Sequence, residues 1–173
     1  MWWTMYIYLL RHAIAVERGT VHYPNDDRPL SEKGVKRFLK GARGIAALLD
    51  EIDVILTSPL KRAHETAIMT AKQCGIPRKV VITEHLLPGC IHDTLIPLLR
   101  KYKDKKHVML VGHEPDLSRL ASNLLGSSRS VIEFKKGALC CIELPSLAPN
   151  AAGVLHWHLQ PKQLRCLKRS RNE

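Results

Sequence analysis

The sequence predicts an α/β fold, a three-layer α/β/α sandwich with a mostly parallel central sheet and a C-terminal antiparallel β-β pair at the edge. Three observations predict this architecture. Short apolar runs of strand length alternate with segments of helical periodicity along most of the chain. Such alternation is typical of parallel strands whose two faces are both covered by helices. The last two strand-like runs have no helix between them, which indicates an antiparallel pair.

The N-terminal part begins with a buried strand and a long loop. Residues 5–10 form a short apolar run, which predicts a central strand. Residues 13–29 show no lasting periodicity and contain Gly, Pro, Asn and Asp, so we expect a loop, and loops of this length are often functional. Ser31 is expected to cap the following helix, which Gly41 and Gly44 weaken.

Apolar runs of strand length and segments of helical periodicity also predict the remaining elements. We expect strands at residues 53–57, 79–83, 107–112, 138–144 and 154–159, and helices at residues 60–74, 92–102 and 115–125. One domain is expected over residues 1–160, followed by a basic C-terminal tail over residues 161–173. The charges of that tail are expected to be solvated, and they belong to Lys162, Arg165, Lys168, Arg169 and Arg171.

Composition narrows the class of protein. The chain has 173 residues, of which 45% are hydrophobic and 25% charged, as in an ordinary soluble globular protein. Five cysteines without a C-x-x-C spacing favour a reducing compartment over a disulfide framework. The apolar segment 1–10 lacks a basic leader and ends at Arg11, before it reaches membrane-spanning length. We expect a cytoplasmic protein without membrane contact, and of the oligomeric states a monomer is favoured.

The formal net charge of +11 points to an anionic partner. An anionic substrate, an acidic protein or nucleic acid would each satisfy this charge. The sequence contains no recognisable nucleic-acid-binding motif, so nucleic acid is the weakest of the three.

Charged and nucleophilic side chains follow three of the predicted strands. Arg11 and His12 end the first strand, Arg62 lies in the first turn of the helix after the second, and His113 follows the strand at 107–112. Ligands of an open parallel sheet bind beyond the carboxyl ends of its strands. Arginine matches phosphate oxygens, one imidazole can attack phosphorus, and a second can stabilise the transferring group. The pattern predicts a phosphoryl-transfer pocket that requires no metal.

Other polar residues receive a structural interpretation. His156 and His158 alternate along a predicted strand, which would place them on one face, but no metal-binding motif accompanies them. A half-exposed strand face is the better interpretation, and we expect neither a metal nor another cofactor. Asp26 and Asp27 are interpreted as solvated loop residues, and Ser58 matches no nucleophile motif.

The strand-end residues lie in segments that resemble the histidine phosphatase superfamily, also called the phosphoglycerate mutase-like family. The matching segments are Leu10-Arg11-His12-Ala13, the run from Ser58 to Ala67, and Val111-Gly112-His113-Glu114-Pro115. Within the family the chain is most similar to the SixA branch of protein phosphohistidine phosphatases. That similarity rests on the small size, on Arg28-Pro29-Leu30-Ser31 leading to Gly34, and on the final β-β pair. It runs from about Tyr6 to Leu159.

The resemblance implies a metal-independent phosphatase that works through a phosphohistidine enzyme intermediate. His12 would be the phosphorylated nucleophile. Arg11, Arg62 and His113 would hold the phosphoryl group, and Arg28 matches a basic position near the pocket that helps bind phosphate.

The chain departs from the family at two places. Ala13 replaces the glycine that is common after the Arg-His pair, which is a minor change. Larger branches use a Glu or Asp after the third strand to protonate an alkoxide leaving group, and here either Glu84 or His85 is the possible general acid.

This uncertainty about the acid bears on the substrate. An alkoxide needs a general acid, worth about 10²–10⁴-fold in rate, whereas phosphohistidine releases an imidazole, which leaves well. A phosphorylated protein carrying phosphohistidine, as in a histidine-transfer domain, is therefore the favoured substrate. One alternative is a phosphomonoesterase for small phosphate esters. A second alternative is a non-enzymatic regulator that binds an anion or nucleic acid.

Overall fold

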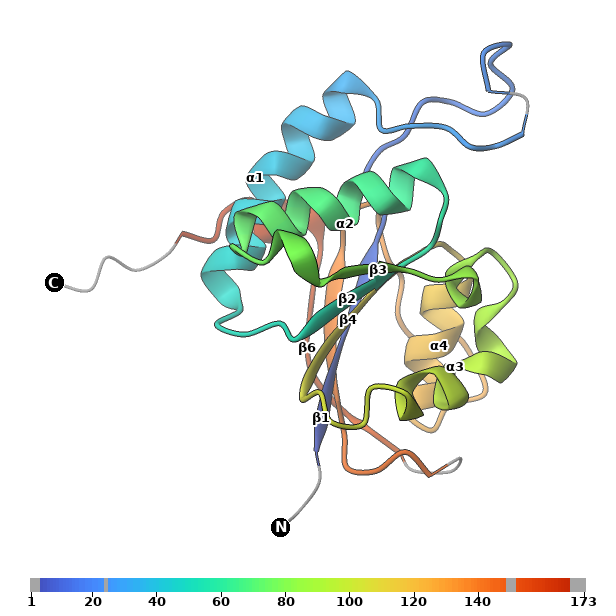
Figure 1. Cartoon of the computed structure of the whole chain (residues 1–173), viewed down its shortest axis with the longest axis vertical. Helices are drawn as coiled ribbons and strands as arrows, with labels where there is room; N and C mark the ends of the chain where they lie inside the picture. The colour runs from blue at the N-terminus through green and yellow to red at the C-terminus, as the bar shows by residue number, and fades with distance from the viewer. Residues whose placement is uncertain (1–3, 24, 149–151, 169–173) are drawn as a thin grey trace, which may run out of the picture.

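One six-stranded sheet organises the computed structural model, which describes residues 4–23, 25–148 and 152–168 (Figure 1). The strand order is β3-β2-β4-β1-β5-β6. The strands are β1 (Met5–Arg11), β2 (Val54–Thr57), β3 (Val80–Ile82), β4 (His107–Gly112), β5 (Leu139–Leu144) and β6 (Val154–Leu159). The first four run parallel, β5 is antiparallel to β1, and β6 is antiparallel to β5. The mostly parallel sheet with an antiparallel edge is therefore confirmed.

Helices cover both faces of this sheet (Figure 1). They are α1 (Glu32–Leu48), α2 (Lys61–Gln73), α3 (Ile91–Arg100), α4 (Asp116–Leu124) and α5 (Pro161–Leu164), with two short 3₁₀ helices, η1 (Pro77–Lys79) and η2 (Glu84–Leu86). Along β1, Ile7 and Leu9 pack toward α3 and α4, whereas Tyr8 and Leu10 pack toward α1 and α2. Because both faces are covered, the central strands are apolar on both sides. The three-layer sandwich is confirmed.

The parallel strands end together at one edge of the sheet. In the registers, Arg11 is paired with Gly112 and Thr57 with Val111. The residues that follow β1, β2 and β4 therefore leave the sheet at the same level. This topology brings three segments that are far apart in sequence to one place, as expected for ligand sites of parallel sheets.

Helix α1 begins at the predicted cap and depends on two glycines. Ser31 Oγ accepts a hydrogen bond from the Gly34 N–H at 3.0 Å. A Cβ on Gly34 would lie 1.9 Å from the Ile14 carbonyl oxygen, and a Cβ on Gly44 would lie 1.8 Å from that of Leu164. The sequence indicated only that Gly44 weakens the helix. The structure shows that it lets the backbone of α5 approach.

That approach corrects the expectation for the C-terminal segment. Residues Pro161–Leu164 form α5, and the Leu164 side chain is fully buried in the core on the α1 and α2 side. Figure 1 shows this segment beside α1. Leu164 therefore anchors the first residues of the segment that was expected to be a tail, whereas Lys162 and Lys168 are exposed, as expected for its charges. Arg169 and Arg171 lie outside the described residues.

The pairing of His156 with His158 is also corrected. A β-bulge interrupts the β5–β6 ladder at this point and changes the alternation of side chains. His156 packs against Tyr6 and bonds to Glu143, whereas the His158 ring lies 4.9 Å from that of Phe134, on the other side of the sheet. In the parts of the chain that are described, no three His, Cys, Asp or Glu side chains are grouped as they would be around a metal ion.

Two further observations concern the class of protein. All five cysteines are free, and burial raises the pKa of the Cys140 and Cys141 thiols to about 12. Among the helices of the described ranges, none combines the length and the apolar character needed to cross a bilayer.

Candidate active site

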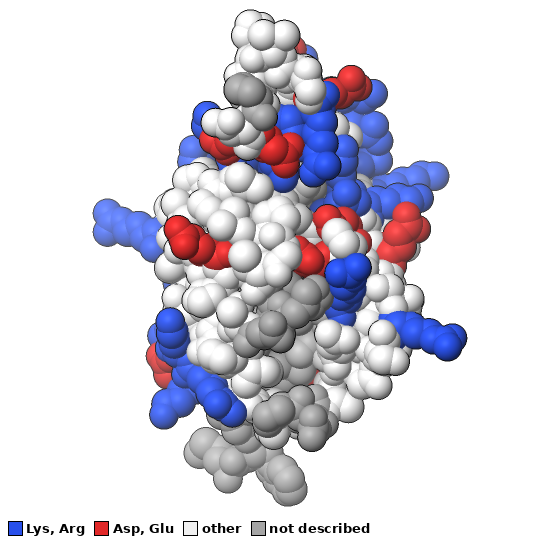
Figure 2. Space-filling view, turned by 90° about the vertical axis from the view of Figure 1, so that its right-hand side faces the viewer, with Lys and Arg blue, Asp and Glu red and all other residues white. Residues whose placement is uncertain are grey.

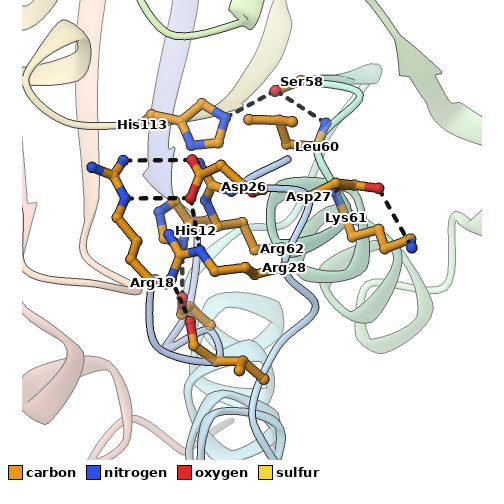
Figure 3. A network of polar contacts seen from close by, with 12 residues as sticks. His12, Arg18, Asp26, Asp27, Arg28, Ser58, Leu60, Lys61, Arg62 and His113 are labelled. Atoms are coloured by element: carbon orange, nitrogen blue, oxygen red, sulfur yellow. Dashed lines mark hydrogen bonds and ion pairs between the residues drawn. The ribbon is translucent and has the colours of Figure 1, made fainter. Parts of the chain in front are cut away.

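The strand ends bring His12, Arg62 and His113 together in a buried cluster (Figure 3). His12 follows β1, Arg62 lies in the first turn of α2, and His113 follows β4. Their exposed fractions are 6%, 2% and 4%, and the two imidazole ring centres are 5.2 Å apart. Three of the four residues predicted from the strand ends thus share one buried place, and the fourth, Arg11, is half-buried beside them.

His12 is held as a neutral imidazole with a defined tautomer. Its Nδ1 lies 2.7 Å from the Ala13 carbonyl oxygen, which can only accept, so Nδ1 carries the proton. The lone pair is then on Nε2. Burial lowers the pKa of His12 to about 2, helped by His113 and by the positive charges of Arg62 and Arg11. At neutral pH the ring therefore has a free nucleophilic nitrogen.

His113 is oriented by Ser58. Its Nε2 lies 2.9 Å from Ser58 Oγ, which also accepts a hydrogen bond from the Leu60 N–H at 3.3 Å. Burial and then the charge of Arg62 lower the pKa of His113 to about 3, so this ring is neutral too. Ser58 thus contacts a predicted site residue. Its local sequence did not indicate this contact, because His113 lies 55 positions away along the chain.

Several buried nitrogen atoms near this edge have no hydrogen-bond partner among the described residues. Arg11 Nε, Arg62 Nε and His113 Nδ1 are buried without a hydrogen-bond partner in the described parts of the chain. Buried donors are normally satisfied, and these three come from residues placed at the three strand ends. The donor set fits an anion such as a phosphoryl group.

The long loop contributes a carboxylate that the sequence interpretation missed. Asp26 Oδ1 accepts from Arg28 Nε at 2.8 Å, and Asp26 Oδ2 accepts from Arg62 Nη2 at 3.2 Å. Arg18 Nε lies 3.3 Å from the same carboxylate. Burial raises the pKa of Asp26, but the hydrogen bond from Arg28 and the charges of the arginines outweigh burial and lower it. Asp26 is therefore more than a solvated loop residue, because its partly exposed carboxylate is the partner of three arginines (Figure 3).

Arg28 and Asp27 are fixed by the same loop. Arg28 is buried and also donates to the Val16 carbonyl oxygen. Asp27 Oδ1 accepts from the Lys61 N–H at 2.8 Å, at the start of α2, where Leu60 provides no side-chain cap. This cap comes from 34 residues upstream, so local capping rules could not find it. The loop both caps α2 and aligns Arg28 with Arg62.

The two candidate acids lie in η2, directly after β3. Glu84 is exposed, and its carboxylate forms no hydrogen bond or ion pair within the described residues. His85 is half-buried, and its N–H donates to Thr83 Oγ1 at 3.4 Å. None of the described contacts of either residue joins it to His12 or His113. An acid role for Glu84 or His85 stays a prediction.

Two other ionisable groups lie near Arg11. Burial raises the pKa of Glu114, which accepts from Ser118 Oγ at 2.5 Å and feels the charge of Arg11. Burial also lowers the pKa of Lys136, and the charges of Arg11, Arg28 and Arg62 lower it further. The sequence offered one signal for Glu114, which directly follows His113, whereas the place of Lys136 in the turn before β5 gave no such signal.

Comparisons with known proteins agree with this geometry. The profile of the histidine phosphatase superfamily (branch 1) matches residues 7–87. An uncharacterized protein of Picosynechococcus is 35% identical over 141 residues, covering 78% of this chain and 82% of its own. The chain belongs to the histidine phosphatase superfamily. The activity at this coarse level is therefore that of a phosphatase. An uncharacterized protein of Mycobacterium tuberculosis is 31% identical, covering 62% of this chain and 67% of its own.

Solved structures share the histidine phosphatase fold with this chain. The protein histidine phosphatase SixA, solved with tungstate, matches with a TM-score of 0.75 and 22% identity, over 92% of this chain and 99% of that chain. A mycobacterial glucosyl-3-phosphoglycerate phosphatase matches with a TM-score of 0.67 and 16% identity, over 88% and 97% of the two chains. The fold is thus shared by proteins named for a protein substrate and for a small phosphate ester.

Proposed function

We propose that this histidine phosphatase removes the phosphoryl group from phosphohistidine in another protein, through a covalent intermediate on His12. The observation that supports this proposal best is the hydrogen bond from His12 Nδ1 to the Ala13 carbonyl oxygen, which leaves Nε2 of this buried ring unprotonated. Arg11 and Arg62 supply guanidinium donors for the phosphoryl oxygens. We assign Ser58 Oγ as the donor to His113 Nε2, 2.9 Å away, which places the proton of His113 on Nδ1 and makes that N–H available to the transferring group.

The reaction has two steps. The reactive form of the substrate is phosphohistidine protonated on the ring nitrogen that carries no phosphoryl group. His12 Nε2 attacks phosphorus, the N–P bond of the substrate breaks, and the substrate leaves as neutral imidazole, while phospho-His12 keeps its Nδ1 proton and carries the positive charge. Water then attacks the phosphorus of phospho-His12, both water hydrogens stay on the released dihydrogen phosphate, and His12 returns to the neutral ring. Because neutral imidazole is a good leaving group, neither step needs the general acid that an alkoxide leaving group requires. The exposed, unpartnered Glu84 is consistent with this substrate.

A second candidate is the hydrolysis of small phosphate esters. The observation that favours it is Glu114, which is half-buried next to His113 and whose pKa burial raises. A carboxyl group with a raised pKa is suited to protonate an alkoxide. If esters are the substrates, Glu114→Gln should lower kcat for alkyl phosphates far more than kcat for phosphohistidine.

Trapping the intermediate tests the mechanism. Incubation with a phosphohistidine-containing transfer protein should give an acid-labile, base-stable phosphoenzyme, which should be absent in His12→Ala. Unchanged turnover in that variant would contradict the role of His12. Comparison of kcat/KM for the transfer protein with kcat/KM for a panel of sugar phosphates tests the substrate, and a preference for the sugars would favour the second candidate.

A further inference from the structure

A cavity lies beside Arg11, one of the four residues at the strand ends. It has a volume of about 800 Å³ and lies between α1, the turn that precedes β5, and α5. We call it the α1–α5 groove. Six of its described lining residues are cationic, and none is acidic. The cations are Arg11, Arg37, Lys135, Lys136, Lys162 and Arg165. The groove is much larger than a single phosphate requires, so it can hold a further part of a ligand.

The walls of the groove are fixed by the fold. Gln160, just before α5, accepts from the Lys135 N–H at 3.2 Å and donates to the Glu133 carbonyl oxygen at 2.8 Å. These two bonds tie the turn before β5 to the start of α5. The contact between Gly44 and Leu164 holds α5 against α1. The cations are therefore presented by a built surface and not by a free tail.

Two residues join the groove to the phosphoryl pocket. Arg11 lines the groove and also belongs to the strand-end cluster, where its charge acts on His12 and His113. Lys136 lines the groove as well, and it feels the charges of Arg11, Arg28 and Arg62. A substrate whose phosphoryl group lies at His12 would therefore extend naturally into the groove.

Five of the six groove cations form no ion pair with a carboxylate among the described residues. Among the described residues, the side chains of Arg37, Lys135, Lys136, Lys162 and Arg165 form no ion pair or hydrogen bond. Like charges gathered without partners repel one another and favour an external anion. The apolar side chains of Phe38 and Pro161 in the same groove add a surface for the body of such a ligand.

We propose that the α1–α5 groove binds a second anionic group of the phosphorylated substrate, a carboxylate or phosphate carried beyond the phosphoryl group that His12 attacks. This inference rests on the proposed phosphatase function and specifies its substrate class as multiply anionic. Two sources share this chemistry. One is an acidic side chain near the phosphohistidine of a protein, and the other is the second phosphate of a small molecule.

Charge reversal in the groove tests the proposal. The variants are Arg37→Glu on α1 and Lys162→Glu on α5, and the matched control is Lys101→Glu, an exposed cation after α3 on the other face of the sheet. The first substrate pair is a phosphohistidine peptide with acidic flanks and one with neutral flanks. The second pair is a sugar bisphosphate and the matching monophosphate. In each pair the readout is kcat/KM for the more anionic substrate divided by kcat/KM for the less anionic one.

Each groove variant should lower the ratio about tenfold in at least one pair, mainly through KM, and added salt should shrink the effect. The pair that responds identifies the source of the second anion. Ratios that match those of Lys101→Glu in both pairs would overturn the proposal. Calorimetric binding of inorganic tripolyphosphate gives a readout without turnover. If no phosphohistidine is hydrolysed but tripolyphosphate binding is weakened only by the groove variants, the proposed substrate fails and the groove assignment stands.

Discussion

Two groups of cations adjoin each other in this phosphatase and are held in different ways. Arg28 and Arg62 are buried, and the carboxylate of Asp26 holds both. The lysines and arginines that line only the α1–α5 groove form no ion pairs among the described residues, and Lys135 and Lys162 are exposed. Figure 2 shows Lys and Arg side chains gathered toward the upper end of one face, with a few carboxylates among them.

The difference separates two uses of positive charge. A buried guanidinium with a fixed partner has its direction set before a ligand arrives, which is what stabilisation of a transferring group requires. An exposed, unpaired cation attracts anions over a longer range, and salt screens that attraction. The first group is therefore suited to chemistry and the second to the choice of substrate.

The largest expected effect is on activity. Arg62→Ala should lower kcat/KM for p-nitrophenyl phosphate about 10³-fold, or about 4 kcal/mol, because it removes a buried donor from the phosphoryl site. Lys135→Ala in the groove should change the same value only about twofold. Steady-state kinetics of the two variants at equal ionic strength measures this contrast. Equal losses would remove the distinction between the two groups.

The next effect concerns acid stability. His12 and His113 have pKa values of about 2 and 3 in the folded chain, below the ordinary value of 6.5. The unfolded chain therefore binds more protons below pH 6.5, so the free energy of unfolding falls as the pH drops from 6.5 toward 3. Each histidine contributes about 1.4 kcal/mol per pH unit to this slope.

Denaturant titrations between pH 7 and pH 4 measure the slope. The double variant His12→Gln, His113→Gln should flatten it, whereas His22→Gln, at an exposed loop position, should not. A double variant with the wild-type slope would show that the two imidazoles are not buried as neutral rings.

A third prediction concerns the wall of the groove. Gly44→Ala should destabilise the fold by about 1–3 kcal/mol, because the new Cβ would meet the Leu164 backbone and push α5 away. Gly41→Ala is the matched control in the same helix. Its Cβ would lie 3.9 Å from Phe38, so helix propensity should stabilise the fold by about 0.5–1 kcal/mol. Thermal unfolding of both variants measures these changes. Shifts of the unfolding temperature with the same sign would contradict the close approach of α5 to Gly44.

The smallest effect is that of Asp26→Asn. The amide keeps a hydrogen-bond acceptor near Arg28 but removes the negative charge shared by three arginines. We expect inorganic phosphate to inhibit severalfold more strongly, because the arginines then keep more of their positive charge for the anion. The free energy of unfolding should fall by only about 1–2 kcal/mol, because the partial exposure of Asp26 weakens its ion pairs. Inhibition constants and unfolding curves measure both changes. An unchanged inhibition constant would mean that the Asp26 charge does not act on the anion site.

Much of the fold follows from local patterns along the chain. The apolar run that became β1 and the cap at Ser31 were predictable because strand periodicity and helix capping are local properties. The convergence of His12, Arg62 and His113 was predictable because parallel strands end at one edge of a sheet. These rules need no knowledge of which distant side chains meet.

The tertiary structure decided what those rules cannot reach. Asp26 holds an arginine 36 residues away, and Asp27 caps a helix 34 residues away. A bulge in the β5–β6 ladder separates His156 from His158. One buried leucine turns a basic segment into the wall of a groove. By itself the sequence determined the order of the elements and the nucleophilic strand ends, since these depend on neighbours along the chain. The partners of those residues depend on contacts between distant segments, and only the packed structure brings such segments together.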